Sequence, residues 1–196
     1  MSADQTHPGA AGVATVLAVG LGGGYLAVGA SIYDPLSRVE PGCQGVPANQ
    51  DPAHFTVSEL DATPYLMPRS EDVAFPRRDA AITIRAFWIP SDAGPDAPAA
   101  IVVHGLNGCR RSEGNLLAAG MLHRNGFAAL VLDLRNHGDS AREYGRCSGG
   151  IKEHRDVLGA WDWLVTRQRL PPARIGSRRP GRTAATPKST PRSAAS

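Results

Sequence analysis

"AAIVVHG", residues 99–105, is a continuous run of apolar residues that ends in a histidine and a glycine. A run of this kind predicts a central strand that other structure covers on both faces. "FAALVLDL" (127–134) is a second such run, and "ARIG" (173–176) begins a third. We therefore expect three buried strands in one sheet.

Two amphipathic segments lie between these strands and predict helices. The first spans 112–126 and places four apolar residues on one helical face: Leu116, Leu117, Met121 and Leu122. The second spans 151–168, with a stripe formed by Val157, Leu158, Trp161 and Leu164. Upstream, 72–76 and 81–90 alternate apolar and polar positions, which indicates a pair of half-exposed edge strands. The expected fold class is α/β, a mostly parallel sheet with flanking helices.

Polar, glycine-rich sequence follows two of the buried strands. "HGLNGCR" (104–110) comes after the first and "DLRNHGDS" (133–140) after the second. Ligands of parallel α/β sheets bind beyond the carboxyl ends of the strands. We therefore expect the functional site at these two segments.

The order of "VVHGLNG", "LVLDLRNHGDS" and "GGIKEHRDVLGAWDWL" resembles the α/β-hydrolase superfamily. The closest likeness is to membrane-anchored serine hydrolases similar to prolyl aminopeptidases and esterases. It covers about residues 70–176, which corresponds to the N-terminal half of such a fold. Two positions depart from the family pattern, because Asn136 stands where glycine is usual and Asp79-Ala80 where Asp-Gly is frequent.

The resemblance assigns roles to both glycine-rich segments. It places the backbone N–H of Leu106 in the oxyanion hole, with His104 and Gly105 shaping the turn, because a fixed donor stabilises the charge that develops during acyl transfer. Three residues of the second segment are expected to hold loops together rather than to react: Asp133, Arg135 and His137. The implied substrate of an intact relative is a small molecule or a peptide, and no cofactor is implied.

The family's nucleophile is expected after the third buried strand, on a G-x-S-x-G turn, with the acid and the histidine later in the chain. This sequence has no G-x-S-x-G and no His, Asp or Glu after residue 176. The segment "RCSGG" resembles the G-x-S-x-G motif only weakly, with Ser148 as the serine and His154 as a possible base. We interpret Ser148 as a loop or helix-capping residue. We interpret Ser140 as a loop residue. No catalytic nucleophile, acid or base is therefore predicted. We expect an inactive, truncated form, with a non-catalytic membrane-tethered binding or scaffold protein as the alternative.

Residues 177–196 form a basic tail rich in Pro, Ser and Thr. The tail carries five basic residues and no acidic one, so the rest of the chain is mildly acidic although the whole has a net charge of +3. Its charges are unpatterned and lack interleaved aromatic residues, so no nucleic-acid partner is expected. A natural disordered arm, a processed extension and an out-of-frame product of a GC-rich gene all fit. The abrupt change of composition in mid-strand favours the out-of-frame product.

Three cysteines, Cys43, Cys109 and Cys147, have no spacing typical of a metal site, so no metal is predicted. One disulfide plus a free thiol fits if the domain lies outside the cytoplasm.

The 25 residues from Gly9 to Tyr33 carry no charge and follow a short N-terminal segment, 1–8. This length suits a transmembrane helix that Asp34-Pro35 would end, and we expect a single-pass membrane anchor of undetermined orientation. A cleaved signal peptide and a buried or disordered segment are the alternatives. Residues 34–70 are then a spacer, and 71–176 the truncated hydrolase domain.

Overall fold

A computed structural model of the chain describes residues 8–39, 43, 61–79 and 81–178. Its centre is a five-stranded sheet with the strand order β1-β2-β4-β3-β5. The strands are β1 (Glu71–Pro76), β2 (Thr83–Ile89), β3 (Ala99–Val103), β4 (Ala128–Leu132) and β5 (Ile175–Arg178). β3, β4 and β5 are parallel, whereas β2 runs antiparallel to both β1 and β4. The predicted α/β class is confirmed, and β2 lies inside the sheet rather than at its edge.

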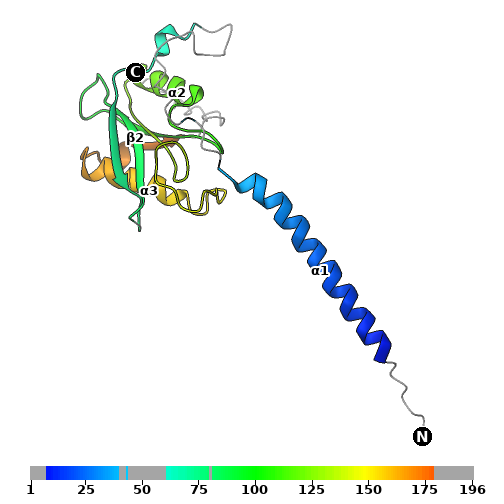
Figure 1. Cartoon of the computed structure of the whole chain (residues 1–196). Helices are drawn as coiled ribbons and strands as arrows, with labels where there is room; N and C mark the ends of the chain where they lie inside the picture. The colour runs from blue at the N-terminus through cyan, green and yellow to red at the C-terminus, as the bar shows by residue number, and fades with distance from the viewer. Residues whose placement is uncertain (1–7, 40–42, 44–60, 80, 179–196) are drawn as a thin grey trace, which may run out of the picture.

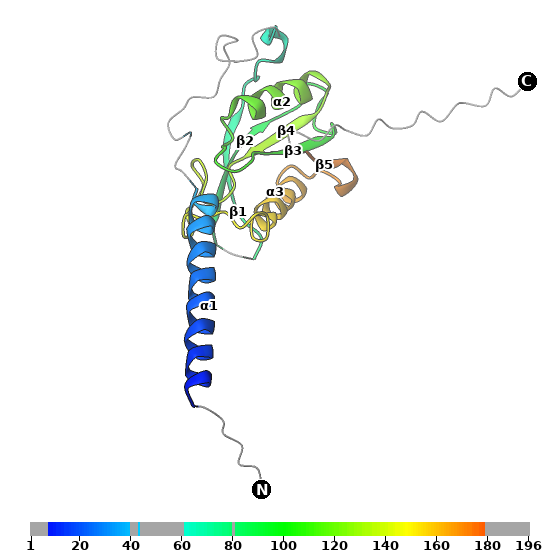
Figure 2. The ribbon, with the colours of Figure 1, turned by 90° about the vertical axis from the view of Figure 1, so that its right-hand side faces the viewer.

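The two predicted helices connect the parallel strands and cover opposite faces of the sheet. α2 (Glu113–Arg124) links β3 to β4, and α3 (His154–Thr166) links β4 to β5. Figure 2 shows the sheet between them. Short 3-10 turns, η2 (Thr63–Tyr65) and η3 (Pro172–Arg174), precede β1 and β5.

Alternate residues of each strand point to opposite faces and so build two hydrophobic cores. On β4, Leu130 and Leu132 belong to the core under α3, and Ala129 and Val131 to the core under α2. This two-sided burial is why these strands are continuously apolar in the sequence.

The face that α2 buries differs in part from the predicted one. Leu116 is fully buried and Leu122 packs against the same core, but the side chain of Met121 is 43% exposed. Gly120 is buried instead of Met121. Only glycine fits at this position, because a side chain would collide with the backbone carbonyl of Tyr65. A close approach between two backbones therefore sets the orientation of α2.

The N-terminal helix α1 spans Pro8–Ser37 and projects away from the sheet (Figure 1). In the part of the chain that the structure describes, no helix combines the length and the apolar content that a membrane crossing requires. This finding contradicts the predicted membrane-anchored localisation, and it leaves the predicted transmembrane helix over 9–33 and the membrane as a partner without support.

The end of α1 also differs from the expectation, because the helix continues through Asp34-Pro35 to Ser37. Arg146 holds this last turn, since its guanidinium donates to Ser37 Oγ at 2.9 Å and to the carboxylate of Asp34. The backbone N–H of Val39 then donates to the carbonyl of Gly145 at 3.0 Å. The first residues of the predicted spacer are thus attached to the loop that precedes α3. The rest of that spacer, except Cys43 and 61–70, and tail residues 179–196 lie outside the described residues.

Candidate functional site

The two glycine-rich segments lie side by side because they follow neighbouring parallel strands. Val103 of β3 pairs with Leu132 of β4, so the turns that start at His104 and Asp133 leave the same edge of the sheet. The rings of His104 and His137 are 4.6 Å apart between centroids. The structure therefore brings the predicted site residues of both segments together.

His104 is fixed by two hydrogen bonds, one at each ring nitrogen. Nδ1–H donates to the carbonyl of Gly105 at 2.7 Å, and Nε2 accepts from the backbone N–H of Leu134 at 3.0 Å. Burial lowers the pKa of His104 to about 4, so the ring is neutral near pH 7. With both nitrogens engaged, His104 fastens the end of β3 to the end of β4 and has no lone pair left for a reacting group.

The turn after His104 exposes Leu106 at the edge of the sheet. The N–H of Gly108 donates to the carbonyl of Gly105 at 3.2 Å, and Asn107 has a φ of 57°. This combination is that of a type II turn with Leu106 at its second position. Among the hydrogen bonds of the described residues, none uses the backbone N–H of Leu106. The geometry agrees with the predicted donor role, which stays a prediction.

The second segment is organised around Asp133, whose side chain is fully buried. Its carboxylate accepts from the backbone N–H groups of Arg110 at 2.6 Å and Asp139 at 3.0 Å. Burial raises its pKa, although these hydrogen bonds act against the shift. Gly138 has a φ of +49° and leaves no room for a side chain, because a Cβ would meet the carboxylate of Asp133. Asp133 therefore joins the loops that follow β3 and β4.

Arg110 is the cation of this junction, and its side chain has no exposed surface. The guanidinium donates to Asp139 Oδ2 at 2.7 Å and Asp72 Oδ2 at 3.0 Å, and it lies 4.4 Å from the centre of the Phe87 ring. No sequence motif marks Arg110 as a functional residue, although it is the last residue of the glycine-rich segment 104–110. A charged residue just after a turn is usually exposed, so the sequence carries no signal that this one is buried.

Arg135 connects the same loop to the start of α3. Its buried guanidinium donates to Glu143 and, at 3.2 Å, to Glu153. Its backbone N–H donates to Asp156 Oδ2 at 3.0 Å. Burial raises the pKa of Asp156 to about 6. Arg135 thus contacts Glu143 in this loop and Glu153 and Asp156 at the start of α3, and its expected loop-joining role stays a prediction.

Ser148 and Ser140 have hydrogen-bond partners other than histidine. Ser148 Oγ donates to Glu153 Oε2 at 2.6 Å and accepts from the N–H of Lys152 at 2.8 Å. Burial raises the pKa of Glu153, but the hydrogen bonds from Ser148 outweigh it and lower the pKa to about 2. Ser140 Oγ donates to the carbonyl of Asp133 at 2.7 Å. Ser140 Oγ also accepts from the backbone N–H of Arg85 on β2 at 2.8 Å. None of these contacts involves a histidine.

His137 differs from His104 in one respect. Its Nδ1–H donates to the carbonyl of Arg135 at 2.9 Å, but its buried Nε2 has no hydrogen-bond partner among the described residues. Burial also lowers the pKa of His137. The ring is thus neutral near pH 7, with the lone pair of Nε2 unused.

A cavity of about 510 Å³ opens at this edge of the sheet. It is bounded by the ends of β3 and β4, by the loop before α3 and by the last turns of α1. Its lining includes the predicted residues His104, Gly105, Leu106 and His137, together with Leu134, Cys147, Ile151 and Glu153. The sequence located this edge, but it did not show that α1 contributes Tyr33 and Leu36 to the wall.

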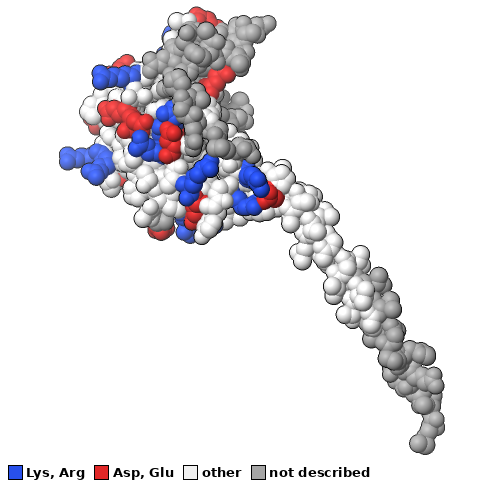
Figure 3. Space-filling model, in the orientation of Figure 1, with Lys and Arg blue, Asp and Glu red and all other residues white. Residues whose placement is uncertain are grey.

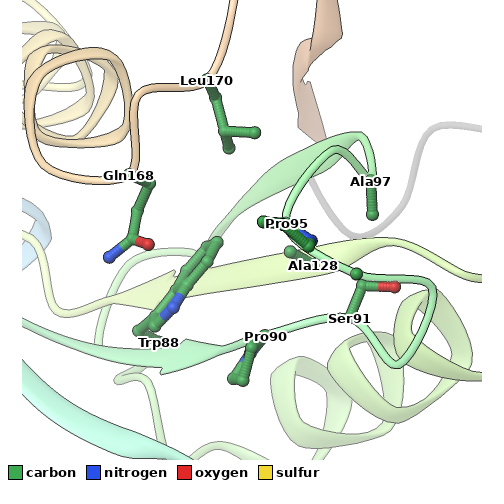
Figure 4. Close-up of a pocket in the computed structure, with 9 residues that line it drawn as sticks. Trp88, Pro90, Ser91, Pro95, Ala97, Ala128, Gln168 and Leu170 are labelled. Carbon is green, nitrogen blue, oxygen red and sulfur yellow. The ribbon is translucent and has the colours of Figure 1, made fainter.

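A second cavity of about 310 Å³ lies at the amino ends of β3 and β4 (Figure 4). Trp88, Pro90, Pro95 and Leu170 line it, with Ser91 and Gln168 as its polar side chains. None of its lining residues is acidic, basic or a histidine. It therefore lacks the groups that acid–base chemistry requires.

Cys43 and Cys109 form a disulfide whose Cα atoms are 6.0 Å apart, and Cys147 is free. Cys109 follows the Gly105–Gly108 turn directly, so the disulfide ties the spacer to this part of the site. The sequence was compatible with one disulfide, but it did not show which two of the three cysteines form it. Within the described residues, no three His, Cys, Asp or Glu side chains converge as metal ligands would.

Solved structures resemble this chain over part of its length. An esterase of Pyrococcus furiosus, Pf2001, matches with 25% identity and a TM-score of 0.51, over 72% of this chain and 47% of its own. The α/β-hydrolase GrgF from Penicillium sp. sh18 matches with 20% identity and a TM-score of 0.52, over 57% of this chain and 37% of its own. No protein-family model matches the sequence, and no significant match was found among curated proteins.

These likenesses confirm the α/β-hydrolase resemblance, and the chain carries part of an α/β-hydrolase fold. It spans less than half the length of the two solved relatives named above.

Proposed function

We propose that residues 71–176 are the N-terminal half of a serine-hydrolase domain that, in its intact form, cleaves ester, amide or peptide bonds. The observation that carries this proposal is the turn after β3, where Leu106 lines a cavity at the carboxyl edge of the sheet and its N–H has no hydrogen-bond partner among the described residues. Acyl transfer needs such a fixed donor where negative charge develops on the carbonyl oxygen. The 25% identity to an esterase supports this class of reaction.

By the same proposal, the 196-residue chain alone has no such activity. His104 uses both ring nitrogens, and Ser148 and Ser140 are hydrogen-bonded within their loops. A serine nucleophile requires a base of suitable strength within hydrogen-bonding distance. Ser148 contacts Glu153, whose pKa of about 2 makes it too weak a base, and Ser140 donates to a backbone carbonyl. The purified chain should neither hydrolyse p-nitrophenyl acetate nor react with a fluorophosphonate probe. Stoichiometric labelling of either serine, located by mass spectrometry, would overturn this part of the proposal.

The donor role of Leu106 is testable in a chimera that joins residues 1–176 to the C-terminal half of the Pyrococcus furiosus esterase. Leu106→Pro removes the N–H but suits the second position of a type II turn, and Leu106→Ala is the matched control that keeps the N–H. Loss of one oxyanion donor typically lowers kcat by about 10²- to 10³-fold. We expect that loss for Leu106→Pro and little change for Leu106→Ala. Equal activity of the two variants, with matching circular dichroism spectra, would refute the assignment.

A further inference from the structure

The cavity at the amino ends of β3 and β4 is separate from the candidate site (Figure 4). The candidate site begins at His104, after β3, whereas Ala97 lines this cavity before the same strand. Among the described residues, the two cavities share no lining residue. With about 310 Å³, this cavity reaches the range of about 300–1,000 Å³ that is typical of small-molecule sites. It is therefore a second candidate for ligand binding.

Contacts between distant segments hold the walls of this cavity in place. One wall is the loop 90–98, where Ser91 Oγ donates to the carbonyl of Gly126 at 2.9 Å. The other wall is the segment before β5, and the guanidinium of Arg174 in this segment donates to the backbone carbonyl of Asp96 in the loop. A site that is already held in its bound shape loses less conformational entropy when a ligand binds. The cavity is thus formed before a ligand arrives.

Apolar side chains form most of the lining, and their arrangement suits a flat ring. Figure 4 shows Trp88 on one side of the cavity and Pro95 and Ala97 on the other. The indole of Trp88 is itself fixed by an edge contact with Trp163, at 5.6 Å between ring centroids. Aromatic rings pair favourably in stacked or edge arrangements with their centroids about 4.5–7 Å apart. A planar aromatic ring therefore matches the space between Trp88 and Pro95.

Gln168 is the polar side chain of the lining that remains open to a ligand. It is half-buried, and it has no hydrogen-bond partner in the part of the chain that the structure describes. The other polar side chain, Ser91, already donates its proton to a carbonyl and accepts from the N–H of Ala93. The amide of Gln168 offers one acceptor and two donors in a single plane, and a second carboxamide offers the matching pair. Two parallel hydrogen bonds can then form at once.

The charges around the cavity exclude an ionised ligand. No acidic or basic side chain lines it, so a charged group would be buried without a counter-ion. The loop 90–98 also carries Asp92 and Asp96, whose exposed carboxylates disfavour an anion at the entrance. A carboxylate would, in addition, leave the amide oxygen of Gln168 without a donor. A suitable ligand is therefore neutral.

We propose that this cavity binds a small, neutral aromatic carboxamide, whose ring lies between Trp88 and Pro95 while its amide pairs with the side-chain amide of Gln168. The ligand is held by contacts that require no nucleophile, acid or base. Because this cavity shares no lining residue with the one at the carboxyl edge, the proposal stands apart from the proposed hydrolase function. A failure of either test leaves the other interpretable.

The test compares benzamide with acetophenone on the full ¹⁵N-labelled chain at pH 7.5. The two probes share the ring and the carbonyl, but acetophenone has a methyl group where benzamide has its N–H donors. We expect benzamide to shift the NMR signals of the Gln168 side-chain amide and of the Trp88 indole. The backbone signal of Leu106, at the other cavity, should not respond and is an internal control. Benzamide should bind about tenfold more tightly than acetophenone, which corresponds to about 1.4 kcal/mol.

Two variants separate the amide of Gln168 from the general shape of the cavity. Gln168→Leu keeps a side chain of similar size and should abolish the preference for benzamide, whereas Arg167→Leu changes the neighbouring residue outside the lining and should retain it. If Gln168→Leu does not fold, the comparison of the two probes on the unchanged chain still decides. Equal affinity for the two probes, or benzamide-induced shifts at Leu106 and none at Gln168, would overturn the proposal. So would the absence of a saturable shift.

Discussion

His104 should make the stability of this protein depend on pH in a calculable way. Its pKa is about 4 in the folded protein and 6.5 when unperturbed, because burial disfavours the charged ring. Between these values the unfolded chain binds more protons than the folded one, so stability falls as the pH falls. From pH 7.5 to pH 5 the shift corresponds to a loss of about 2 kcal/mol in the free energy of unfolding.

Asp156 acts in the opposite direction over an overlapping range. Its pKa is raised to about 6 from 3.8, so the folded protein binds the extra proton and gains stability as the pH falls. Over the same interval this gain is about 1 kcal/mol, and it would hide part of the His104 effect in a single protein. The measurement therefore needs a variant that lacks only the titration of His104.

His104→Gln is that variant, because its amide offers one acceptor and one donor to replace the contacts with Leu134 and Gly105. Urea unfolding of both proteins at pH 7.5 and pH 5, followed by circular dichroism, gives the difference in free energy at each pH. We expect the stability of the unchanged chain relative to the variant to be about 2 kcal/mol lower at pH 5 than at pH 7.5. A difference that does not change with pH would refute the reasoning. So would an NMR titration that places the pKa of His104 near 6.5 in the folded protein.

Two further predictions concern stability. Gly120→Ala should lower the free energy of unfolding by about 1–3 kcal/mol because its Cβ meets the Tyr65 carbonyl. Gly114→Ala in the same helix has open space and should leave stability unchanged or raise it by up to about 1 kcal/mol, and equal effects in urea unfolding would contradict this explanation. Replacing Cys43 and Cys109 by serine removes a link across 66 residues and should cost about 4 kcal/mol in the chain-entropy model. In urea unfolding, adding a reductant to the double variant should cause no further loss, and equal stability of the double variant and the oxidised parent would count against the disulfide.

Much of the fold could be predicted because it follows from short-range patterns. Continuous apolar runs such as 99–103 are what two-sided burial requires, and the following glycine-rich segments placed the site at the carboxyl edge. The apolar face of α2 was predicted only in part, since its orientation depends on a backbone contact between Gly120 and Tyr65 that has no local signal. For α1, an uncharged run predicted a membrane span, whereas no helix among the described residues qualifies as one.

The charges of the surface and of the interior illustrate the same limit. Figure 3 shows basic and acidic side chains interspersed over the visible face of the domain, which the mildly acidic composition of 1–176 already suggested. Nothing in the sequence distinguishes Arg110 from an exposed arginine. In the structure it is nevertheless buried between three aspartates and the ring of Phe87. Burial of a charge depends on partners from distant segments, here β1, β2 and the loop after β4.

The sequence by itself determined the fold class, the order of the elements and the edge of the sheet where the candidate cavity opens, because each depends on periodicity and on turn residues within one segment. Only the tertiary structure decided the separate roles of two similar histidines. Leu134 N–H occupies His104 Nε2, whereas nothing among the described residues occupies Nε2 of His137. That difference arises from which backbone groups reach each ring, and it exists only after β3 and β4 have paired.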